Sequence, residues 1–332
     1  MRPAATRPRQ PGTVVPEAGI PVSGTGVNAT GRYAPSPTGE LHLGNLRTAL
    51  LAWLFARAAG VRFLLRIEDL DAGRVREQFV GQQLADLRAI GLDWDGDVVR
   101  QSQRADRYAA ALARLEAEGR VFRCFCSRRE VREATSAPHG ELPEGFYPGT
   151  CLRLGAAESA RRAEAGEGYA LRLRAERAEV TFRDRLHGER SDRVDDLVLR
   201  RRDGAFAYNL AVVVDDAAQG VTEVVRGDDL LPSTAGQAHL CDLLGLARPV
   251  WAHVALVLGP DGTRLAKRHG AVTLGDLATA RGWHATDAVA WMAASLGLAA
   301  AGECASAAEL VARFNPKALP REPTTFAGSD PV

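Results

Sequence analysis

Two polar segments far apart in the chain carry residue types suited to phosphate chemistry. The first, residues 32–50 (RYAPSPTGELHLGNLRTAL), places His42, Gly44 and Asn45 at the expected start of a helix. A helix start with small residues and free amides binds phosphate, and a histidine there can donate a hydrogen bond to it. The same letters also suit a turn followed by a core histidine, so this segment alone leaves both interpretations open.

The second segment, residues 258–271 (LGPDGTRLAKRHGA), is a glycine-flanked polar loop around Lys267, one of only two lysines in the chain. Arg264, Arg268 and His269 lie close to it in the sequence. A loop with a fixed cation commonly clamps phosphates during their transfer. A solvated surface loop is the alternative.

A third candidate site consists of cysteines. Cys124 and Cys126 form a C-x-C pair, and Cys151 follows in a Y-x-x-x-C pattern that begins at Tyr147. Three thiolates and one further donor can complete a tetrahedral zinc site. Tyr147 and His139 are both candidates for the fourth ligand, and three unrelated reduced cysteines are the alternative.

The elements that must position these residues are those of a parallel α/β sheet. The spacing of apolar residues predicts a strand that ends at 32–34, a helix over 46–59 and a strand over 61–67. A second helix has Val80, Leu84 and Leu87 on one face. This alternation of strands and helices opens a parallel sheet.

Later in the chain, Asp203 and Gly204 predict a hairpin turn, and the apolar run 210–214 predicts a buried parallel strand. We divide the chain into a flexible leader (1–30), the first half of the main domain (31–121), an inserted subdomain (122–190), the second half of the main domain (191–270), a helical region (271–319) and a tail (320–332).

Composition excludes several classes of protein. The 332 residues are 46% hydrophobic and 25% charged, which is ordinary for a globular protein. A net charge of +1 argues against a strongly basic nucleic-acid coat, although it permits a local basic patch. The chain has no apolar run of about 18 residues and no signal-peptide pattern, and five cysteines do not suggest a disulfide framework. We therefore expect a cytoplasmic protein without a membrane partner.

Together these motifs resemble those of the class I aminoacyl-tRNA synthetases. The first segment is similar to their HIGH-type motif, and RLAKR (264–268) is similar to their KMSKS-type loop. FLLRIEDLD (63–71), YNLAVVVDD (208–216) and RGDDLL (226–231) resemble the glutamyl-tRNA synthetase branch. The resemblance covers about residues 31–320 and implies a Rossmann-type parallel sheet, an inserted zinc-binding subdomain and a C-terminal helical region.

The resemblance also implies a site for glutamate and a site for ATP. Glu68 matches the acid that takes the ammonium group, and Arg226 matches the contact to the side-chain carboxylate, which suits a guanidinium. A surface salt bridge of Glu68 with Arg66 or Arg74, and a structural role for Arg226, are the alternatives. The expected glutamate-binding residues are Arg32, Ala34, Ser36, Glu68, Tyr208 and Arg226. The expected ATP-binding residues are His42, Gly44, Asn45, Arg264, Leu265, Ala266, Lys267 and Arg268, of which His42 and Lys267 are the expected catalytic residues.

Three positions depart from the family pattern. Val212 stands where some glutamyl-tRNA synthetases have asparagine, Arg264 stands where the loop motif begins with lysine, and Ala266 replaces its central serine. Arg264 keeps the charge, whereas Ala266 loses a hydroxyl. Since Lys267 remains, we expect these departures to change rate or affinity without abolishing the site.

The cysteine pattern and the length resemble one shortened branch of the family, which attaches glutamate to queuosine in the anticodon of tRNA(Asp). The cysteines then imply one structural zinc ion on Cys124, Cys126, Tyr147 and Cys151. Only 64 of the 332 residues follow Arg268, so we expect no anticodon-binding domain there.

This branch implies L-glutamate and ATP with Mg²⁺ as substrates, the tRNA(Asp) anticodon stem-loop as partner and a monomeric enzyme. It would transfer glutamate to the cyclopentenediol of queuosine. Basic residues on strand-like segments are candidates for RNA phosphate contacts, with a solvated face as the alternative. These candidates are Arg183, Arg185 and Arg200 to Arg202.

Three other functions remain open. A truncated glutamyl-tRNA synthetase would charge a tRNA 3′ end. A HIGH-type nucleotidyltransferase or acid–amine ligase would have no RNA partner, but the APSPTG and LRIED segments argue against it. A non-catalytic RNA-binding relic would not need His42, Glu68, Arg226 and Lys267.

Overall fold

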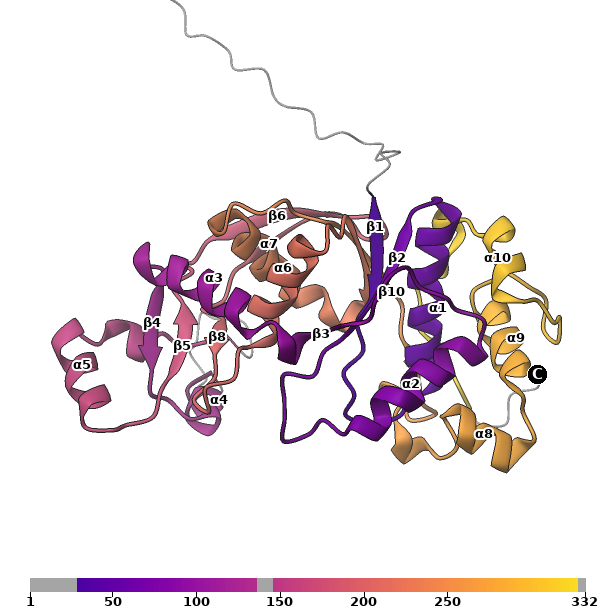
Figure 1. Ribbon diagram of the computed structural model, residues 1–332, viewed down its shortest axis with the longest axis horizontal. Helices are drawn as coiled ribbons and strands as arrows, with labels where there is room; N and C mark the ends of the chain where they lie inside the picture. Colours follow the sequence, from indigo (N-terminus) through magenta and orange to yellow (C-terminus); the bar gives the residue numbers. More distant parts are fainter. Residues whose placement is uncertain (1–28, 136–145, 328–332) are drawn as a thin grey trace, which may run out of the picture.

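The computed structural model describes residues 29–135 and 146–327, and its centre is a layer of parallel strands (Figure 1). In one half, β1 (Thr30–Tyr33) pairs with β2 (Arg62–Ile67), and β2 pairs with β3 (Val99–Arg100). In the other half, β10 (Val250–Val254) pairs in parallel with β9 (Glu223–Gly227) and with β6 (Glu179–Asp184). An antiparallel strand, β7 (Gly188–Arg193), completes the edge beside β6.

The two halves meet between β1 and β9. The amide of Thr222 donates to the carbonyl of Thr30 at 2.9 Å, so the starts of these strands lie side by side. The strand order is therefore β3-β2-β1, then β9-β10-β6-β7. Chain connections leave this junction in opposite directions, which makes it the point where an open α/β sheet binds its ligands.

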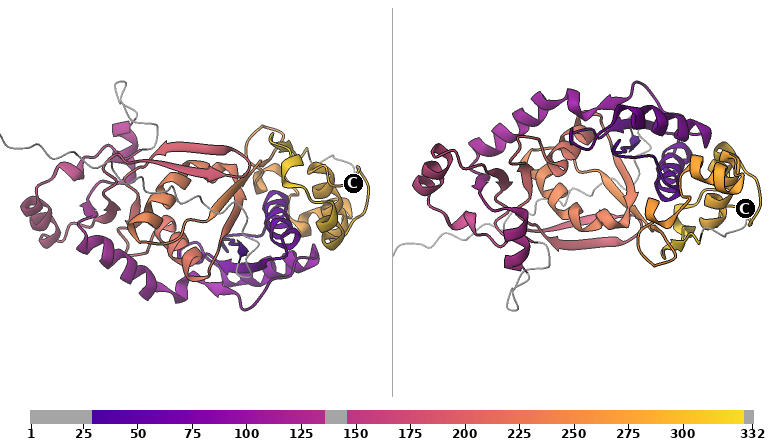
Figure 2. Two further views of the ribbon diagram at one scale, coloured as in Figure 1. Left: turned by 90° about the horizontal axis from the view of Figure 1, so that it is seen from above. Right: turned by 90° about the horizontal axis from the view of Figure 1, so that it is seen from below.

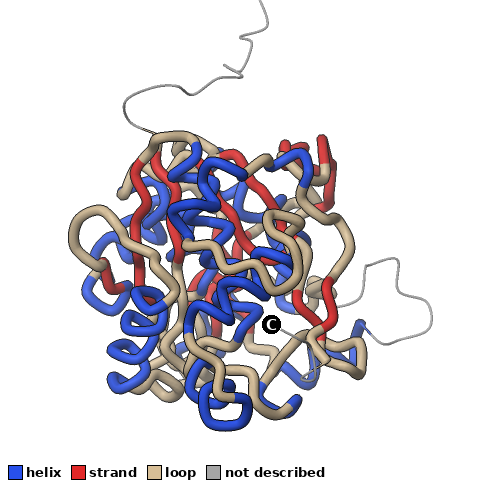
Figure 3. Tube along the Cα trace, turned by 90° about the vertical axis from the view of Figure 1, so that its right-hand side faces the viewer, coloured by secondary structure: helices blue, strands red, loops and turns tan. Residues whose placement is uncertain are grey.

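Helices cover both faces of the layer and extend the molecule at both ends (Figures 1 and 2). α1 (Leu43–Ala58) packs between the sheet and the C-terminal helices α9 (Ala285–Ser295) and α10 (Ala307–Arg313), whose end of the molecule faces the viewer in Figure 3. The remaining helices are α2 (Glu77–Ala89), α3 (Ala105–Ala117), α4 (Arg128–Thr135), α5 (Ala156–Glu164), α6 (Tyr208–Ala218), α7 (Thr234–Leu243) and α8 (Leu274–Arg281). None of those in the described ranges has the length and apolar character that a membrane crossing requires.

A small antiparallel sheet lies at the opposite end of the molecule from the C-terminal helices (Figure 1). It consists of β4 (Val121–Cys124), β5 (Ala170–Leu173) and β8 (Val198–Arg200). Short 3₁₀ turns lie at Gln101–Gln103, Cys151–Arg153, Asp228–Ser233, Lys267–His269 and Pro316–Ala318.

Most of the predicted elements around the first motif are confirmed. The helix expected over 46–59 is α1, and the strand expected over 61–67 is β2. Gly204 has a φ of +89° and its amide bonds to the carbonyl of Arg201, as expected of the predicted tight turn. Three helices lie within the region 271–319 that was expected to be helical.

The strand predicted over 210–214 is wrong, because these residues belong to helix α6. All five side chains are buried in the core between α3, α7 and the sheet. A helix that is buried on every side shows the same unbroken apolar run as a buried strand, so periodicity cannot distinguish them.

Two predicted boundaries also differ from the observed packing. β6 lies within the expected insertion (122–190) and β7 crosses its end, yet β6 pairs with β10 of the main layer. β8, which lies beyond residue 190, pairs instead with β5 of the small sheet. The expected tail, 320–332, contains β12 (Thr324–Thr325), which pairs with β11 (Val257–Leu258). Phe326 then packs against Trp283 and Trp291, so apolar burial holds this segment in the core.

Two adjacent acids at the end of α6 connect it to separate parts of the molecule. Asp216 accepts hydrogen bonds from Arg32 on β1 and from Arg66 on β2. Asp215 instead accepts from Arg104 and from the hydroxyl of Tyr108, on or next to α3, at 2.5 and 2.7 Å. Consecutive helix residues point about 100° apart, which lets the pair serve both neighbours.

We expect Asp215→Asn to lower the free energy of unfolding by about 3 kcal/mol, because it leaves Arg104 and its buried neighbours without their counter-charge. The matched control is Asp242→Asn, because Asp242 forms an exposed ion pair with Arg248. We expect its loss to lower the free energy of unfolding by less than about 1 kcal/mol. Urea unfolding of both variants measures the difference. Equal losses in the two variants would contradict the role given to Asp215.

Candidate active site

Every residue predicted to bind glutamate or ATP lines one cleft of about 960 Å³. The cleft lies at the carboxyl ends of β1, β2 and β9, where the strand order reverses. Its walls come from four segments: the turn and helix start after β1, the end of β2, the start of α6 with the end of β9, and the loop after β11. The two polar segments singled out in the sequence therefore face the same cavity.

His42 is the N-cap residue of α1. Its ring Nδ1 accepts a hydrogen bond from the amide of Asn45, and the side chain of Asn45 accepts in turn from the amide of His42. This reciprocal pair leaves the Nε2 nitrogen to carry the proton of a neutral imidazole. Burial, together with the nearby charges of Arg264 and His269, lowers the pKa of His42 from 6.5 to about 4.

Gly44 permits a close approach between the helix start and the strand behind it. A Cβ atom at this position would lie 3.1 Å from His42 Nδ1 and 3.3 Å from Val257 Cβ. Both distances are shorter than ordinary van der Waals contact, so a side chain would displace the histidine ring. The absence of a side chain at Gly44 thus keeps the ring and the start of α1 next to the cleft.

Glu68 enters the cleft from the end of β2. Its amide donates to the carbonyl of Pro35, which fixes the β2 end against the turn after β1. Its carboxylate lies 3.6 Å from the guanidinium of Arg66, with 10% of the side chain exposed. Burial raises the pKa of Glu68 to about 6 against the opposing charges of Arg66 and Arg32. The ion pair of Glu68 with Arg66, which the sequence offered as an alternative, is present, but it is buried at the cleft rather than on the surface.

Arg226 differs from two other buried arginines, Arg32 and Arg66, in its partners. Arg32 and Arg66 are each paired with Asp216. The guanidinium of Arg226 bonds neutral groups instead, among them Gln237 Oε1 at 2.8 Å and the hydroxyl of Tyr208 at 3.4 Å. Burial lowers the pKa of Arg226, because the charged guanidinium has lost its water without gaining a bonded anion. A cation in this state on a cleft wall favours an anionic ligand.

The loop after β11 carries two cations into the cleft. The amide of the buried Leu265 bonds to the carbonyl of Val257, which anchors the loop between its two cations. Arg264 pairs with Asp229 at 2.5 Å, and the ammonium of Lys267 pairs with Glu40 at 2.6 Å. Sequence reasoning missed both acids. Each lies inside a motif already noted, but no local pattern shows which cation it meets across the cleft.

The family departures have different surroundings. Val212 is 1% exposed in the core of α6 and does not line the cleft. Arg264 and Ala266 do line it, and the guanidinium of Arg264 forms an ion pair with Asp229.

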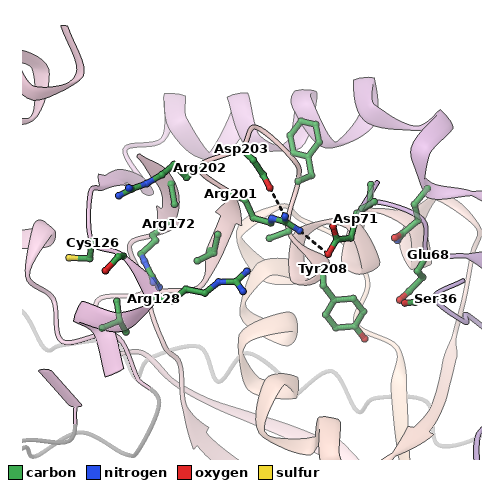
Figure 4. Close-up of a pocket in the computed structure, with 18 residues that line it drawn as sticks. Ser36, Glu68, Asp71, Cys126, Arg128, Arg172, Arg201, Arg202, Asp203 and Tyr208 are labelled. Carbon is green, nitrogen blue, oxygen red and sulfur yellow. Dashed lines mark hydrogen bonds and ion pairs between the residues drawn. The ribbon is translucent and has the colours of Figure 1, made fainter. Parts of the chain in front are cut away.

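A second cavity, of about 1210 Å³, adjoins the first (Figure 4). The two share Ser36, Glu68 and Tyr208 as lining residues. Figure 4 shows the arginines of the second cavity between these shared residues and Cys126 at the far end. They are Arg128, Arg172, Arg201 and Arg202.

Two of the predicted RNA-contact arginines line this second cavity. Arg201 is held there between Asp71, at 3.5 Å, and Asp203 (Figure 4). Arg202 donates to the carbonyl of Phe125. The other candidates do not line it: Arg185 pairs with Glu223, and Arg183 and Arg200 are exposed elsewhere.

The three clustered cysteines come together as the sequence predicts. The Sγ atoms of Cys124, Cys126 and Cys151 all lie within 4.8 Å of one another. The hydroxyl of Tyr147 lies 3.7 Å from Cys126 Sγ and accepts from the amide of Cys151 at 2.7 Å. His139, the other candidate for a fourth ligand, lies outside the described residues. Three sulfur donors at this spacing, with a phenol beside them, can surround one tetrahedral ion.

Comparison with known proteins agrees with this geometry. The model of the class I tRNA synthetases (E and Q), catalytic domain, matches residues 28–327. The chain belongs to this family. It therefore carries the catalytic domain of an aminoacyl-tRNA ligase, an enzyme class that uses ATP.

Individual relatives and one solved structure show which members of the family the chain is similar to. The chain is 60% identical over 297 residues to a Glutamyl-Q tRNA(Asp) synthetase of Nocardia farcinica, covering 90% of this chain and 93% of that protein. It is 48% identical over 305 residues to a protein of the same name in Symbiobacterium thermophilum, covering 88% and 94%. A glutamate tRNA ligase from Elizabethkingia meningosepticum, solved in complex with its amino acid, superposes with a TM-score of 0.77 at 26% identity, covering 90% of this chain and 67% of that one.

We expect the ring of His42 to stay neutral down to a pH of about 4 in the folded enzyme. Because the folded pKa lies below the unfolded value of 6.5, the unfolded chain binds this proton first. The stability due to neutral His42 is thus complete above pH 6.5 and is lost as the pH falls through about 4. An NMR titration, with the resonance assigned by its loss in His42→Gln, measures the midpoint. A midpoint near 6.5 would contradict the buried, accepting role of Nδ1.

Proposed function

We propose that this protein activates L-glutamate with ATP and transfers the glutamyl group to queuosine in the anticodon of tRNA(Asp). The observation that carries the proposal is the 60% identity to the Nocardia farcinica protein across 93% of that protein's length. The cleft supports it physically, since it combines a buried cation without a bonded anion, a buried acid and a loop of cations.

The binding of glutamate follows from the charges of the cleft. Arg226 takes the side-chain carboxylate, since it is the buried guanidinium bonded to neutral groups. Glu68 takes the ammonium group, and at pH 7 its carboxyl is mostly ionised because its pKa lies at about 6. Ala34 and Ser36, in the turn after β1, complete the wall beside the substrate. The α-carboxylate is then free to face the nucleotide.

The first chemical step needs no general base, because a carboxylate is ionised at about pH 7. An oxygen of the α-carboxylate forms a bond to the α-phosphorus of ATP, the bond to the bridging oxygen breaks, and pyrophosphate leaves with that electron pair. Catalysis is then positioning and charge neutralisation. His42 donates from Nε2 to a phosphate oxygen, and Gly44 supplies an amide of the helix start. Asn45, whose own amide is bonded to His42 Nδ1, holds the ring in this orientation.

The loop after β11 neutralises the departing charge. Lys267 and Arg264 exchange their partners Glu40 and Asp229 for the phosphates of ATP. Leu265, Ala266 and Arg268 form the rest of this wall. Mg²⁺ would enter bound to the nucleotide and add to the same neutralisation.

The second step uses the adjoining cavity. A hydroxyl of the cyclopentenediol attacks the glutamyl carbonyl and an ester bond forms. AMP leaves with the electrons of the broken anhydride bond, and its phosphate takes up the proton of the hydroxyl. The acceptor reaches this carbonyl past Ser36 and Tyr208, which both cavities share. Arg128, Arg201 and Arg202 supply cations for the phosphates of an anticodon stem-loop.

The cysteine cluster supports the far wall of that cavity. A zinc ion on Cys124, Cys126 and Cys151, with Tyr147 as the fourth ligand, would be structural, since all four protein ligands leave no open position. Cys126 lines the cavity, and Arg202 bonds to the carbonyl of Phe125 between two of the cysteines. The ion would thus hold the arginines in place without entering the reaction.

The proposal is tested by ATP–pyrophosphate exchange with each amino acid, followed by transfer of labelled glutamate to tRNA(Asp). We expect exchange with L-glutamate alone among the amino acids. Transfer should require queuosine and persist after removal of the 3′-terminal adenosine of the tRNA, because the acceptor hydroxyl is in the anticodon.

Two outcomes would contradict it. Glutamate on the 3′ end, lost when that adenosine is removed, would favour a truncated glutamyl-tRNA synthetase. No exchange with any amino acid, with or without tRNA, would exclude the adenylation step.

We expect the purified enzyme to contain about one zinc ion per chain and Cys151→Ser to lose most of it, because removal of one of three thiolates weakens a tetrahedral site. Elemental analysis of the dialysed protein measures this. Cys241→Ser is the matched control, since Cys241 is a buried cysteine in the α7 core, far from the cluster in sequence and packing. Equal metal content in the Cys151→Ser variant and the wild type would refute the ligand set.

A further inference from the structure

A chain of three buried side chains lies behind the cleft and ends at Arg226. The carboxylate of Asp184, at the end of β6, lies 2.6 Å from His253 Nδ1 on β10. The other ring nitrogen, Nε2, lies 3.0 Å from Arg226 Nε on β9. The side chains of Asp184 and His253 are both 0% exposed. Neither residue lines the cleft, and neither was singled out from the sequence.

The chemistry at the two ends fixes the hydrogen on the ring. Asp184 already accepts from the backbone amides of Leu186, His187 and His253, so it is an ionised acceptor and Nδ1 must donate to it. The Nε nitrogen of an arginine can only donate, so Nε2 must accept. His253 is therefore a neutral imidazole of one defined tautomer, in agreement with a pKa that burial and the charge of Arg226 lower.

The remaining contacts of Arg226 depend on the same ring. Thr234 Oγ1 accepts from Arg226 Nη2 at 3.0 Å and lies 3.2 Å from His253 Nε2. Gln237 Oε1 accepts from Nη1, and Gln237 is itself oriented through its amide by Asn209. The Nε and Nη2 edge of the guanidinium is thus held by β10 and α7, and Nη1, which bonds Gln237, also faces Tyr208 and the cleft.

We propose that His253 and Asp184 are positioning residues for recognition of the substrate's side-chain carboxylate. Asp184 holds His253 in the tautomer whose Nε2 accepts from Arg226, and that bond sets the rotation of the guanidinium toward the cleft. Because the ring is neutral, it orients Arg226 without placing an anion beside it, so its positive charge stays available to the ligand. This inference rests on the proposed glutamate site.

Two substitutions at one position separate positioning from simple packing. In His253→Gln the longer side chain can place an amide oxygen near the position of Nε2, so it can still accept from Arg226. In His253→Asn the shorter side chain reaches only the position of Nδ1 and leaves Arg226 Nε without an acceptor. His239→Asn on α7 is the matched control, since His239 is a half-buried histidine for which no contact with Arg226 is seen.

The experiment measures glutamate-dependent ATP–pyrophosphate exchange and, without ATP, the calorimetric Kd for L-glutamate. We expect His253→Asn to raise the KM and Kd for glutamate by about tenfold, the effect of one lost hydrogen bond to a charged group, with kcat and the KM for ATP within about twofold. His253→Gln should restore most of the affinity, and His239→Asn should match the wild type. Thermal unfolding and circular dichroism confirm that each variant is folded.

The outcomes distinguish this inference from the proposed function. A wild-type enzyme without glutamate-dependent exchange would overturn the proposed function itself. Normal wild-type exchange with an unchanged KM in His253→Asn would overturn only the positioning role. Equal losses in the Asn and Gln variants, or a parallel rise in the KM for ATP, would show that the ring acts through packing and would also overturn it. Should His253→Asn fail to fold, Asp184→Asn provides the same comparison, because its amide can donate to Nδ1 and move the ring hydrogen to Nε2, and an unchanged KM there would likewise overturn the role.

Discussion

The pairing of Asp216 with two buried arginines is the interaction on which the cleft depends. Arg32 on β1 and Arg66 on β2 both bond this one carboxylate from the end of α6. It joins the two strands to a helix that comes about 150 residues later in the chain. A buried ion pair of this kind is weak evidence for stability, but removal of its acid would leave two guanidinium groups without water or counter-charge. The pairing therefore fixes the positions of the charges of Arg32, Arg66 and Asp216 next to the cleft.

Once Asp216 is paired, the remaining charges already describe the ligand. Arg32, Arg66 and Arg226 stand against Asp216 and Glu68, which leaves one formal positive charge. Glutamate carries two carboxylates and one ammonium group, so its net charge is complementary. The unbalanced cation is Arg226 and the acid in the cleft is Glu68, and in the proposed function they bind the side-chain carboxylate and the ammonium group of glutamate. In the proposed function glutamine would leave this cation uncompensated, which gives a physical ground for discrimination against it.

Some parts of the site could be found from local sequence, because their residues directly follow a strand or begin a helix. His42 begins a helix, so a local pattern names it and places it at the carboxyl edge of the sheet. Glu68 directly follows β2, but its role was inferred from the family resemblance. The acids Glu40 and Asp229 could not be assigned, because their partners come from a loop far along the chain. The same limit explains α6, where burial on every side removes the period that separates a helix from a strand. It also explains why β6 was assigned to the insertion, since strand pairing with β10 is a long-range contact.

The loop after β11 holds its two cations in exposed ion pairs. Lys267 and Glu40 are both substantially exposed, at 53% and 37%, as are Arg264 and Asp229 at 52% and 29%. Exposed pairs of this kind contribute little, about 0 to 1 kcal/mol, because water screens them in both states. A nucleoside triphosphate such as ATP offers the same cations several negative charges within a partly closed cleft, where the attraction is stronger. In the proposed function these exposed ion pairs leave the loop cations exchangeable for phosphates, whereas a buried pair such as Arg66 with Asp216 would have fixed them permanently.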